Sequence, residues 1–398
     1  MRVALVRHRP DDTDTDRDSV PALLARPLED LADDLAALGH EVLVVEARRP
    51  LARGGQKGGP SLEALDRMAQ ARTTPGPSRP GAIVCSTRRG LAAALDPASV
   101  DVALAVGRRA AETLDRVSSD LRVPWLWCPE ATDLRSEPGC VGPWLPRHAD
   151  GFVVGSLPEV ELLARAGVDG GRCEVVPWQL SMPAHGSPAL GEVTECATSV
   201  LTTAGAGGAG VADLIRAVAV LPEMKLCVAV DAATAAGGHT VERWARLAAG
   251  LRAGDRIRFV RITTGEGLRV MVRSSDLVVS VPHGRPETSL LATAMWAGTP
   301  LVASDVAGVR ELVESGTTGL VLPPGQPRRL ARALRVVGRD TPARSTWSWS
   351  AHRRAVERFD RHGTAVTMSR ALAASVASRT DEPGWGPTSD RLDDFAAG

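Results

Sequence analysis

Short runs of apolar residues alternate along the chain with longer segments whose apolar residues recur every three or four positions. The run at 3–6 is followed by leucines at helical spacing that end at Gly39, and then by a second apolar run at 41–45. Short apolar runs predict buried strands, and 3.6-residue spacing predicts helices. A strand, a helix and a strand in this order predict a parallel sheet with right-handed crossovers. The opening of the chain therefore predicts an α/β fold.

The same alternation continues in two series, one in each half of the chain. In the first half, further strands are predicted at 82–85, 100–106, 125–127, 151–154 and 173–176, with a helix at 158–166. In the second half, strands are predicted at 199–203, 225–230, 257–260, 277–281 and 300–303, with helices at 211–220, 241–249, 267–274, 288–296 and 328–337. The pattern predicts two Rossmann-like, doubly wound domains that face each other across a cleft.

Glycine- and proline-rich stretches mark the predicted boundaries. We expect an N-terminal domain at 1–182 with a surface loop at 48–81, and a C-terminal domain at 183–345, with 177–195 as the linker between them. One amphipathic C-terminal crossing helix is expected at 346–378, followed by a disordered tail at 379–398.

Composition narrows the classes of function. The 398 residues suit two domains, and 47 basic residues balance 47 acidic ones without a basic block, so nucleic-acid binding is disfavoured. The six cysteines lack paired metal-ligand spacing and are expected to be small buried residues in a reducing compartment. Since no apolar stretch reaches 18 residues, no integral membrane segment is expected, and the prediction is a cytoplasmic protein.

Several stretches of the second half resemble one family. The segments 274–282, 294–308 and 314–324, together with 210–216, resemble the C-terminal domain of retaining GT-B glycosyltransferases of family 4. The resemblance implies a nucleotide-diphosphate sugar held by the C-terminal domain, an acceptor held mainly by the N-terminal domain, and transfer with retention. It implies neither a metal nor any other cofactor.

The resemblance also shows where the family's charged residues are replaced. The family's arginine on the glycine-rich turn falls on or next to Ala204 and its lysine falls on Ala209, and its two glutamates fall on Arg285 and Thr293. The N-domain histidine falls on Glu130, and the family's glycine-rich acceptor loop corresponds to 21–25, which has no glycine. These departures predict a strongly altered donor site.

The remaining residues of the site keep some capacity to bind an anion. Thr288 or Ser289 can cap the helix that begins there, and the resemblance places Arg261 and Arg285 beside the donor phosphates and base. Glu130, Arg285 and Glu287 are the candidate catalytic residues, although each can also be an ordinary loop or surface residue. The donor-binding candidates are Thr203, Ala204, Gly205, Ala209, Gly210, Arg261, Thr288, Ser289 and Thr293.

Two side-chain types allow alternative interpretations. An exposed histidine without a role is the simpler interpretation of His283, and catalysis by its imidazole is the alternative. The tryptophans at 125, 127, 144 and 178 could stack on a sugar, but simple packing is preferred.

Two hypotheses of function follow. The chain is either a glycosyltransferase that moves a sugar from a nucleotide-sugar donor to a small acceptor, or an inactive paralogue. The paralogue would sense a nucleotide or sugar, or pair with an active glycosyltransferase. Homo-oligomerisation is left open, and the fold alone does not decide between the hypotheses.

Overall fold

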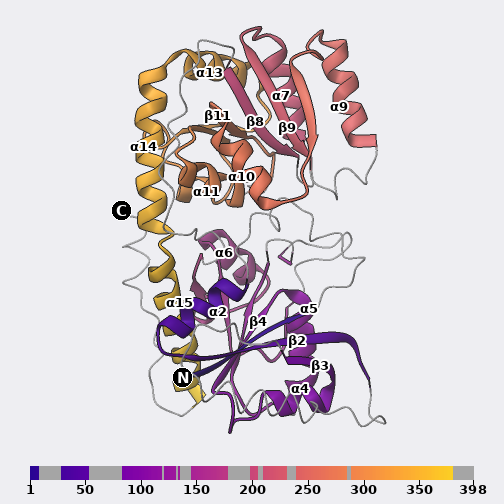
Figure 1. Cartoon of the computed structure of the whole chain (residues 1–398), viewed down its shortest axis with the longest axis vertical. Helices are drawn as coiled ribbons and strands as arrows, with labels where there is room; N and C mark the ends of the chain where they lie inside the picture. The colour runs from indigo at the N-terminus through magenta and orange to yellow at the C-terminus, as the bar shows by residue number, and fades with distance from the viewer. Residues whose placement is uncertain are drawn as a thin grey trace. The chain divides into compact units, whose positions relative to one another are not determined.

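The structure, a computed structural model, describes residues 1–8, 28–52, 83–118, 121–130, 133–134, 145–177, 198–204, 209–230, 239–284 and 288–379. These residues divide into two compact units (Figure 1). The first takes its described residues from the first strand, from Pro27–Trp178 and from His362 onward; the second takes them from Gln179–Arg361. Each unit has its own parallel sheet with helices on both faces.

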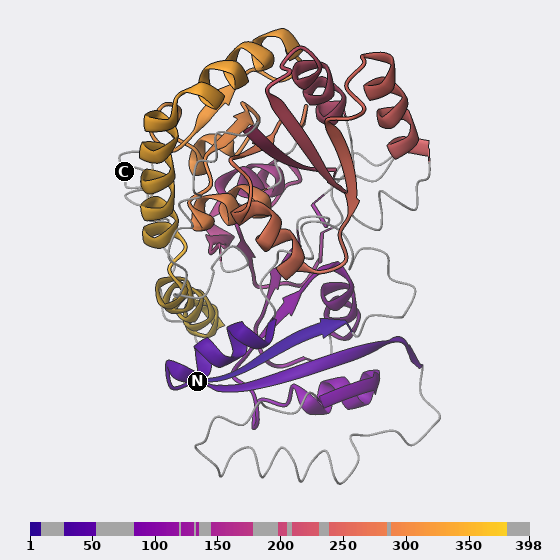
Figure 2. The same ribbon diagram turned by 45° about the horizontal axis from the view of Figure 1, so that its top comes forward.

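The sheet of the first unit has seven parallel strands in the order β3-β2-β1-β4-β5-β6-β7. Figure 2 shows β1 and β2, in indigo, side by side. Each apolar run predicted for this half is a strand. The strands are β1 Arg2–His8, β2 Glu41–Ala52, β3 Ile83–Thr87, β4 Val102–Val106, β5 Trp125–Cys128, β6 Gly151–Val154 and β7 Cys173–Val175.

Alternate side chains of these strands enter two cores, one on each face of the sheet. In β1, Ala4 and Val6 belong to one core, and Val3 and Leu5 to the other, as the two-residue period of a strand requires. The first core is covered by α4 Arg88–Ala94, α5 Arg108–Val117 and α6 Leu157–Arg165, and the second by α2 Leu28–Ala37 and α15 Arg361–Arg379.

The sheet of the second unit has six parallel strands in the order β10-β9-β8-β11-β12-β13. The strands are β8 Thr198–Ala204, β9 Met224–Val230, β10 Ile257–Arg261, β11 Leu277–Ser280, β12 Leu301–Ser304 and β13 Leu320–Leu322. One face is covered by α7 Ala209–Ala219, α9 His239–Gly250 and α13 Pro327–Arg339, and the other by α10 Gly265–Arg273, α11 Thr288–Ala297, α12 Val309–Leu312 and α14 Thr341–Arg358. The predicted α/β class with two doubly wound sheets is confirmed.

Two predicted elements have bounds that differ from those expected. The strand predicted at 41–45 continues to Ala52, into the predicted loop, because an irregular register between Ala47 and Ala52 lets β2 keep pairing with β3. Pro50, which has no backbone N–H to donate, lies within that irregular stretch. The predicted C-terminal helix is two helices, α14 and α15, separated at Phe359 and Asp360, since the Phe359 side chain is buried in the core of the second unit.

Most of the predicted loop at 48–81 and the predicted linker and tail lie outside the described residues. In the described part of the chain, no helix is long and apolar enough to span a membrane. The same residues contain no cluster of three or more histidine, cysteine or acidic side chains that could hold a metal ion.

The cysteines that the structure describes support the expectation of small buried residues. Cys85 and Cys128 are buried, and Cys173 and Cys227 are partly buried. Burial raises the pKa of the Cys85 thiol to about 11, and burial, outweighing the attraction of Arg172, raises that of Cys173 to about 11 as well.

These thiols should resist alkylation in the folded protein. At pH 8 a thiol with a pKa near 11 is about 0.1% thiolate, which is the reactive form. Iodoacetamide followed by peptide mass spectrometry should leave Cys85 and Cys173 unmodified in the native chain and modify both in urea. Rapid native labelling of Cys85 would contradict its buried position in the first core.

Candidate functional site

The strand order of the second sheet creates a crevice at one place. β8 lies between β9 and β11, and the chain leaves β8 toward one face of the sheet and β11 toward the other. In open parallel sheets, ligands bind at the carboxyl ends of the strands where the order reverses in this way. In the second unit that place is the end of β8, the end of β11 and the start of α7 (Figure 1).

Gly210 fixes the start of α7 against the end of β11. A Cβ on Gly210 would lie 1.9 Å from the carbonyl oxygen of Val281 and 2.6 Å from its carbonyl carbon. No side chain fits there, because both atoms belong to the backbone. The glycine therefore brings the first turn of α7, with its unpaired N–H groups and partial positive charge, directly onto the loop that follows β11.

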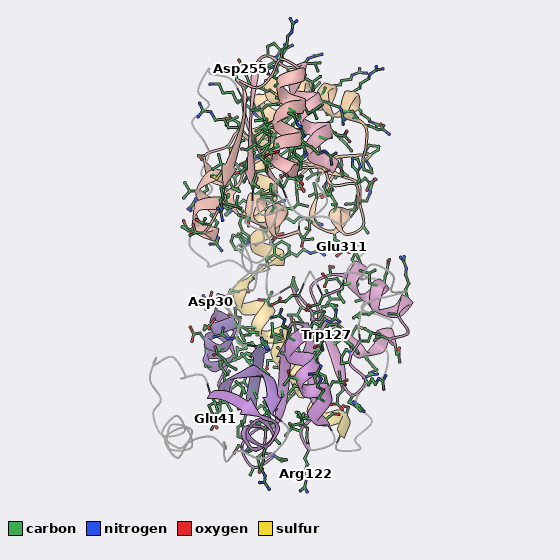
Figure 3. The ribbon with its side chains drawn as sticks, turned by 90° about the vertical axis from the view of Figure 1, so that its right-hand side faces the viewer. Asp30, Glu41, Arg122, Trp127, Asp255 and Glu311 are labelled. Atoms are coloured by element: carbon green, nitrogen blue, oxygen red, sulfur yellow. The ribbon has the colours of Figure 1, made fainter. Side chains whose placement is uncertain are left out.

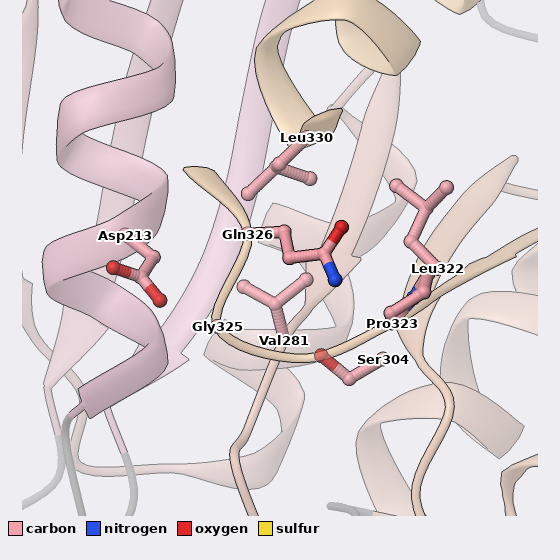
Figure 4. Close-up of a pocket in the computed structure, with 8 residues that line it drawn as sticks. All are labelled: Asp213, Val281, Ser304, Leu322, Pro323, Gly325, Gln326 and Leu330. Atoms are coloured by element: carbon pink, nitrogen blue, oxygen red, sulfur yellow. The ribbon is translucent and has the colours of Figure 1, made fainter. Parts of the chain in front are cut away.

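A small hollow, open to solvent and with an internal volume of only about 10 Å³, lies beside this contact (Figure 4). Figure 4 shows Asp213 projecting from α7 toward the loop that carries Gly325 and Gln326. Ser304 comes from the end of β12 and is buried. The lining consists of Asp213, Val281, Ser304, Leu322, Pro323, Gly325, Gln326 and Leu330. The ends of three strands and the side of α7 thus meet in one small, mainly apolar pocket that carries the Asp213 carboxylate.

An imidazole–carboxylate pair stands at the edge of the hollow. The Nε2 atom of His283 lies 2.8 Å from Oδ2 of Asp213, and Arg216 donates from Nη1 to Oδ1 of the same carboxylate at 3.0 Å. Asp213 is only 9% exposed. Gly325, with φ +71°, lies near the same edge of the His283 ring, since an added Cβ would be 4.0 Å from both Cε1 and Nε2. The imidazole is therefore oriented by Asp213 next to the start of α7.

The first unit has its own arrangement at the carboxyl ends of β4 and β5. Gly107 follows β4 with φ +80° and precedes α5, and the side chain of Glu130 lies against it, 3.4 Å from the position of an added Cβ. Asp133 accepts hydrogen bonds through Oδ2 from the backbone N–H groups of Arg108 (2.8 Å) and Glu130 (2.7 Å). Since Gly107 has no capping side chain, Asp133 supplies the carboxylate at the positive end of α5.

Arg7, near the end of β1, is held by two carboxylates of the first unit. Its guanidinium contacts Glu46 at 2.6 Å and Glu29 at 2.5 Å. Burial lowers the pKa of Arg7, but the hydrogen bonds and charges of Glu46 and Glu29 outweigh burial, so the pKa is raised overall. Arg7 is therefore a fixed cation in a neutralised cluster.

Comparison with known proteins finds a family likeness in the second unit. The family model described as "Glycosyl transferases group 1" matches residues 199–340. This part of the chain is therefore similar to group 1 glycosyl transferases. The hollow, the Gly210 contact and the His283–Asp213 pair all lie within the matched residues.

Curated relatives match part of the chain. The chain is 31% identical to glycogen synthase of Mycobacterium tuberculosis over 172 residues, 42% of this chain and 41% of that enzyme. It is 32% identical to D-inositol 3-phosphate glycosyltransferase of Salinispora arenicola over 155 residues, 39% of this chain and 32% of that enzyme. The chain thus spans less than half of the length of these curated relatives.

Solved structures match nearly the whole chain in fold. The Anabaena protein Alr3699/HepE in complex with UDP and glucose has a TM-score of 0.66 and 17% identity over 94% of this chain and 100% of its own. Sucrose-phosphate synthase from Thermosynechococcus elongatus has a TM-score of 0.63 and 19% identity over 95% and 99%. These likenesses confirm the two-domain GT-B architecture that the sequence predicts.

The structure brings several of the predicted donor-site residues to the strand ends of the second sheet. Thr203 and Ala204 close β8 and are buried, and Ala209 and Gly210 open α7. Gly205, Arg285 and Glu287 lie outside the described residues.

The predicted residues on α11 are oriented by their own helix. Thr288 is its first residue, and Ser289 is buried one position later. The hydroxyl of Thr293, also buried, donates to the carbonyl oxygen of Ser289 at 2.7 Å. The hydroxyl proton of Thr293 is therefore used in a hydrogen bond within α11. Toward a ligand, the Thr293 oxygen can only accept a hydrogen bond.

Arg261 ends the outermost strand of the second sheet. It is the last residue of β10, and its side chain is exposed. The place beside the donor phosphates that the resemblance implies for Arg261 stays a prediction.

Two of the tryptophans are settled as core residues. Trp125 and Trp127 are fully buried in the first core, and Trp127 meets Phe152 edge to face with ring centroids 6.1 Å apart (Figure 3). The preferred interpretation as simple packing is confirmed for both. The tryptophans at 144 and 178 lie outside the described residues.

Sequence reasoning missed Asp213, Ser304 and Gln326. Asp213 stands three positions after Gly210, on the helical face that follows the glycine, which was the one local signal available. Its partner His283 is 70 positions away in the chain, so the pair becomes visible only when β11 and α7 are placed together.

Proposed function

We propose that the chain is a retaining glycosyltransferase of family 4, which transfers a sugar from a nucleotide-diphosphate donor to a small acceptor. One observation supports the proposal most directly. The segment that matches the group 1 family, 199–340, contains the strand-order reversal at which Gly210 holds the start of α7 against Val281. The fold relative HepE is described in complex with UDP and glucose.

The donor diphosphate is proposed to lie at the start of α7. The N–H groups and partial charge of a helix N-terminus suit phosphate oxygens, and Gly210 keeps this end close to the strand edge. Ala204 and Ala209 provide none of the charge that the resemblance leads one to expect. The proposed donor site is therefore altered, with its backbone retained and two of its cations replaced.

His283 is proposed to contact the donor phosphates. Asp213 orients the imidazole, and the residue next to His283, Pro282, has its nitrogen 3.2 Å from the position of an added Gly210 Cβ. An imidazolium placed there can stabilise the leaving diphosphate as the glycosidic bond to the donor breaks.

The acceptor is proposed to bind the first unit at the ends of β4 and β5. Glu130 stands where the family's histidine is expected, and its carboxylate lies beside Gly107. A carboxylate at this place can accept a proton from an acceptor hydroxyl. Arg285 and Glu287 keep their predicted roles as a phosphate ligand and a second carboxylate.

Ligand-dependent melting tests the proposal. UDP, GDP, ADP and their glucose conjugates should be titrated against the full chain, and the matching nucleotide should raise the melting temperature. At a concentration about 100 times the dissociation constant, the stabilisation is about 2.7 kcal/mol. If no nucleotide or nucleotide sugar shifts the melting temperature at roughly millimolar concentration, the donor assignment fails and the inactive-paralogue hypothesis is favoured.

Restoring the family's charges should tighten binding of the same nucleotide. Ala209→Lys places an ammonium at the first residue of α7, and Thr293→Glu places a carboxylate where the family binds ribose. Each change is expected to lower the dissociation constant about tenfold, equivalent to about 1.4 kcal/mol. Weaker binding in Ala209→Lys would show that the diphosphate does not lie at this helix end.

A further inference from the structure

The first unit contains a second hollow, at the opposite end of its sheet from Gly107 and Glu130. It opens where β5, β6 and β7 begin, beneath α15, and its internal volume is about 210 Å³. That volume is below the range of sites for drug-sized ligands and suits a smaller molecule. The lining residues are Leu126, Asp150, Gly151, Phe152, Arg172, Glu174, Ala371, Ser375 and Ser378.

Small residues on two facing elements create this space. Leu126 and Gly151 are register partners in the sheet, and an added Cβ on Gly151 would already meet Leu126 Cδ2 at 3.4 Å. On α15, Ala371, Ser375 and Ser378 follow one another at helical spacing on one face. Larger side chains at these positions would fill the space between α15 and the sheet, and these small residues leave that space open.

The hydroxyl of Ser375 is the polar group that the hollow leaves unsatisfied. Ser375 is 6% exposed, and its Oγ has no hydrogen-bond partner among the described residues. Helical hydroxyls commonly bond the carbonyl four residues earlier, as Thr367 does with Gly363 at 2.9 Å. Because a buried unpaired hydroxyl is costly, Ser375 indicates a partner that enters the hollow.

The charged groups around Ser375 are mixed in sign. Glu174 is the register partner of Val153 and so shares the α15 side of the sheet with Gly151. Asp150 lies at the start of β6. Arg172 donates to the carbonyl oxygens of Asp150, at 3.3 Å, and Ala149, and its guanidinium lies 5.5 Å from the centre of the Phe152 ring. The hollow therefore offers hydrogen-bond donors, acceptors and apolar floor together.

We propose that this hollow binds a small neutral polyhydroxylated molecule, of the size of a monosaccharide. A hydroxyl can donate to Glu174 and accept from Ser375 or Arg172, whereas an anion meets Glu174 and Asp150 and a cation meets Arg172. The C–H face of such a molecule suits the apolar floor formed by Leu126 and Ala371. This site is separate from the proposed donor site and does not depend on the proposed transfer activity.

Binding in the hollow would also fasten α15 to the sheet. The helix and the strands contribute facing sides of the site, so a ligand bridges Ser375 and Glu174. His40 already links this helix to the same unit through Nε2, 2.7 Å from Oγ of Ser369. A polyol would add a second polar link on the same helix, six residues further along.

The test titrates glucose, myo-inositol and sorbitol into the full chain by calorimetry and ligand-observed NMR, up to roughly 100 mM. Putrescine and inorganic phosphate serve as probes of the other charge classes. Ser375→Leu fills the hollow and should weaken polyol binding at least about tenfold, and Glu174→Gln, which keeps the volume, should weaken it about three- to tenfold.

Two controls keep this result distinct from donor binding. Thr367→Ala removes an α15 hydroxyl that is bonded to its own helix, and His283→Ala alters the proposed donor site, so both should leave polyol affinity unchanged. No polyol binding to the native chain, or affinity retained in both Ser375→Leu and Glu174→Gln, overturns the proposal. Binding of putrescine or phosphate in place of the polyols would show that the ligand is charged, and would overturn the proposal of a neutral ligand.

Discussion

Gly210→Ala should destabilise the second unit and abolish donor binding. Alanine normally favours a helix over glycine by about 1 kcal/mol, but here the new Cβ would lie 1.9 Å from the Val281 carbonyl oxygen. Because that oxygen is backbone, α7 or the loop after β11 must move, and the clash outweighs the gain in helix propensity. We expect a loss of roughly 3 kcal/mol in the free energy of unfolding and a fall of about 5–10 °C in melting temperature.

Gly250→Ala is the matched control, since it also adds one methyl group to a helical glycine of the second unit. Gly250 is the last residue of α9, and an added Cβ there meets nothing within 4 Å. That substitution should be neutral or stabilise by up to about 1 kcal/mol. If Gly210→Ala melts like the native chain and still binds the nucleotide, the close contact between α7 and β11 is wrong.

The elements that the sequence predicted are those whose local pattern agrees with their buried position. β6 was predicted at its observed bounds because an apolar run begins at a glycine and ends before polar turn residues. β13 was missed, since three residues between Gly319 and Pro323 are too few for a recognisable period. α5 begins at Gly107 without a capping side chain, so its start carries no signal.

The division between α14 and α15 shows the same limit at a larger scale. The residues between them, Phe359 and Asp360, are neither glycine nor proline, so the local sequence contains no signal for the end of a helix. Burial of Phe359 in the core of the second unit is a tertiary effect, and α15 then joins the second core of the first unit through Met368 and Leu372. The two helices are therefore separated because each packs into the core of a different unit.

The proposed donor site divides in a similar way. Ala204, Ala209, Gly210 and Thr293 were selected through the resemblance, because each stands at a fixed position in a motif. The Asp213–His283 pair was missed, because it is made by two residues on different elements. The resemblance therefore marks the positions where the family's charges are expected, and the structure adds a charged pair beside them.

His283→Ala should weaken nucleotide binding about 10- to 100-fold while leaving the fold intact. A hydrogen bond or close contact to a charged group contributes about 1.5–3 kcal/mol, and His283 is partly exposed, so its removal leaves no buried cavity. Asp213→Asn should have a smaller effect in the same direction, since the amide oxygen still accepts from the imidazole but carries no negative charge. The measurement is the dissociation constant of the nucleotide that raises the melting temperature.

The double variant His283→Ala/Asp213→Asn tests whether the two residues act together. If Asp213 acts through His283, Asp213→Asn should add little once His283 is alanine, and the coupling between the two changes should be about 1 kcal/mol. His148→Ala is the matched control, since His148 also pairs with an aspartate, Asp115, at 3.1 Å, but in the first unit. An unchanged dissociation constant in His283→Ala, with His148→Ala equally silent, would remove the imidazole from the proposed donor site and leave the start of α7 as its remaining positive group.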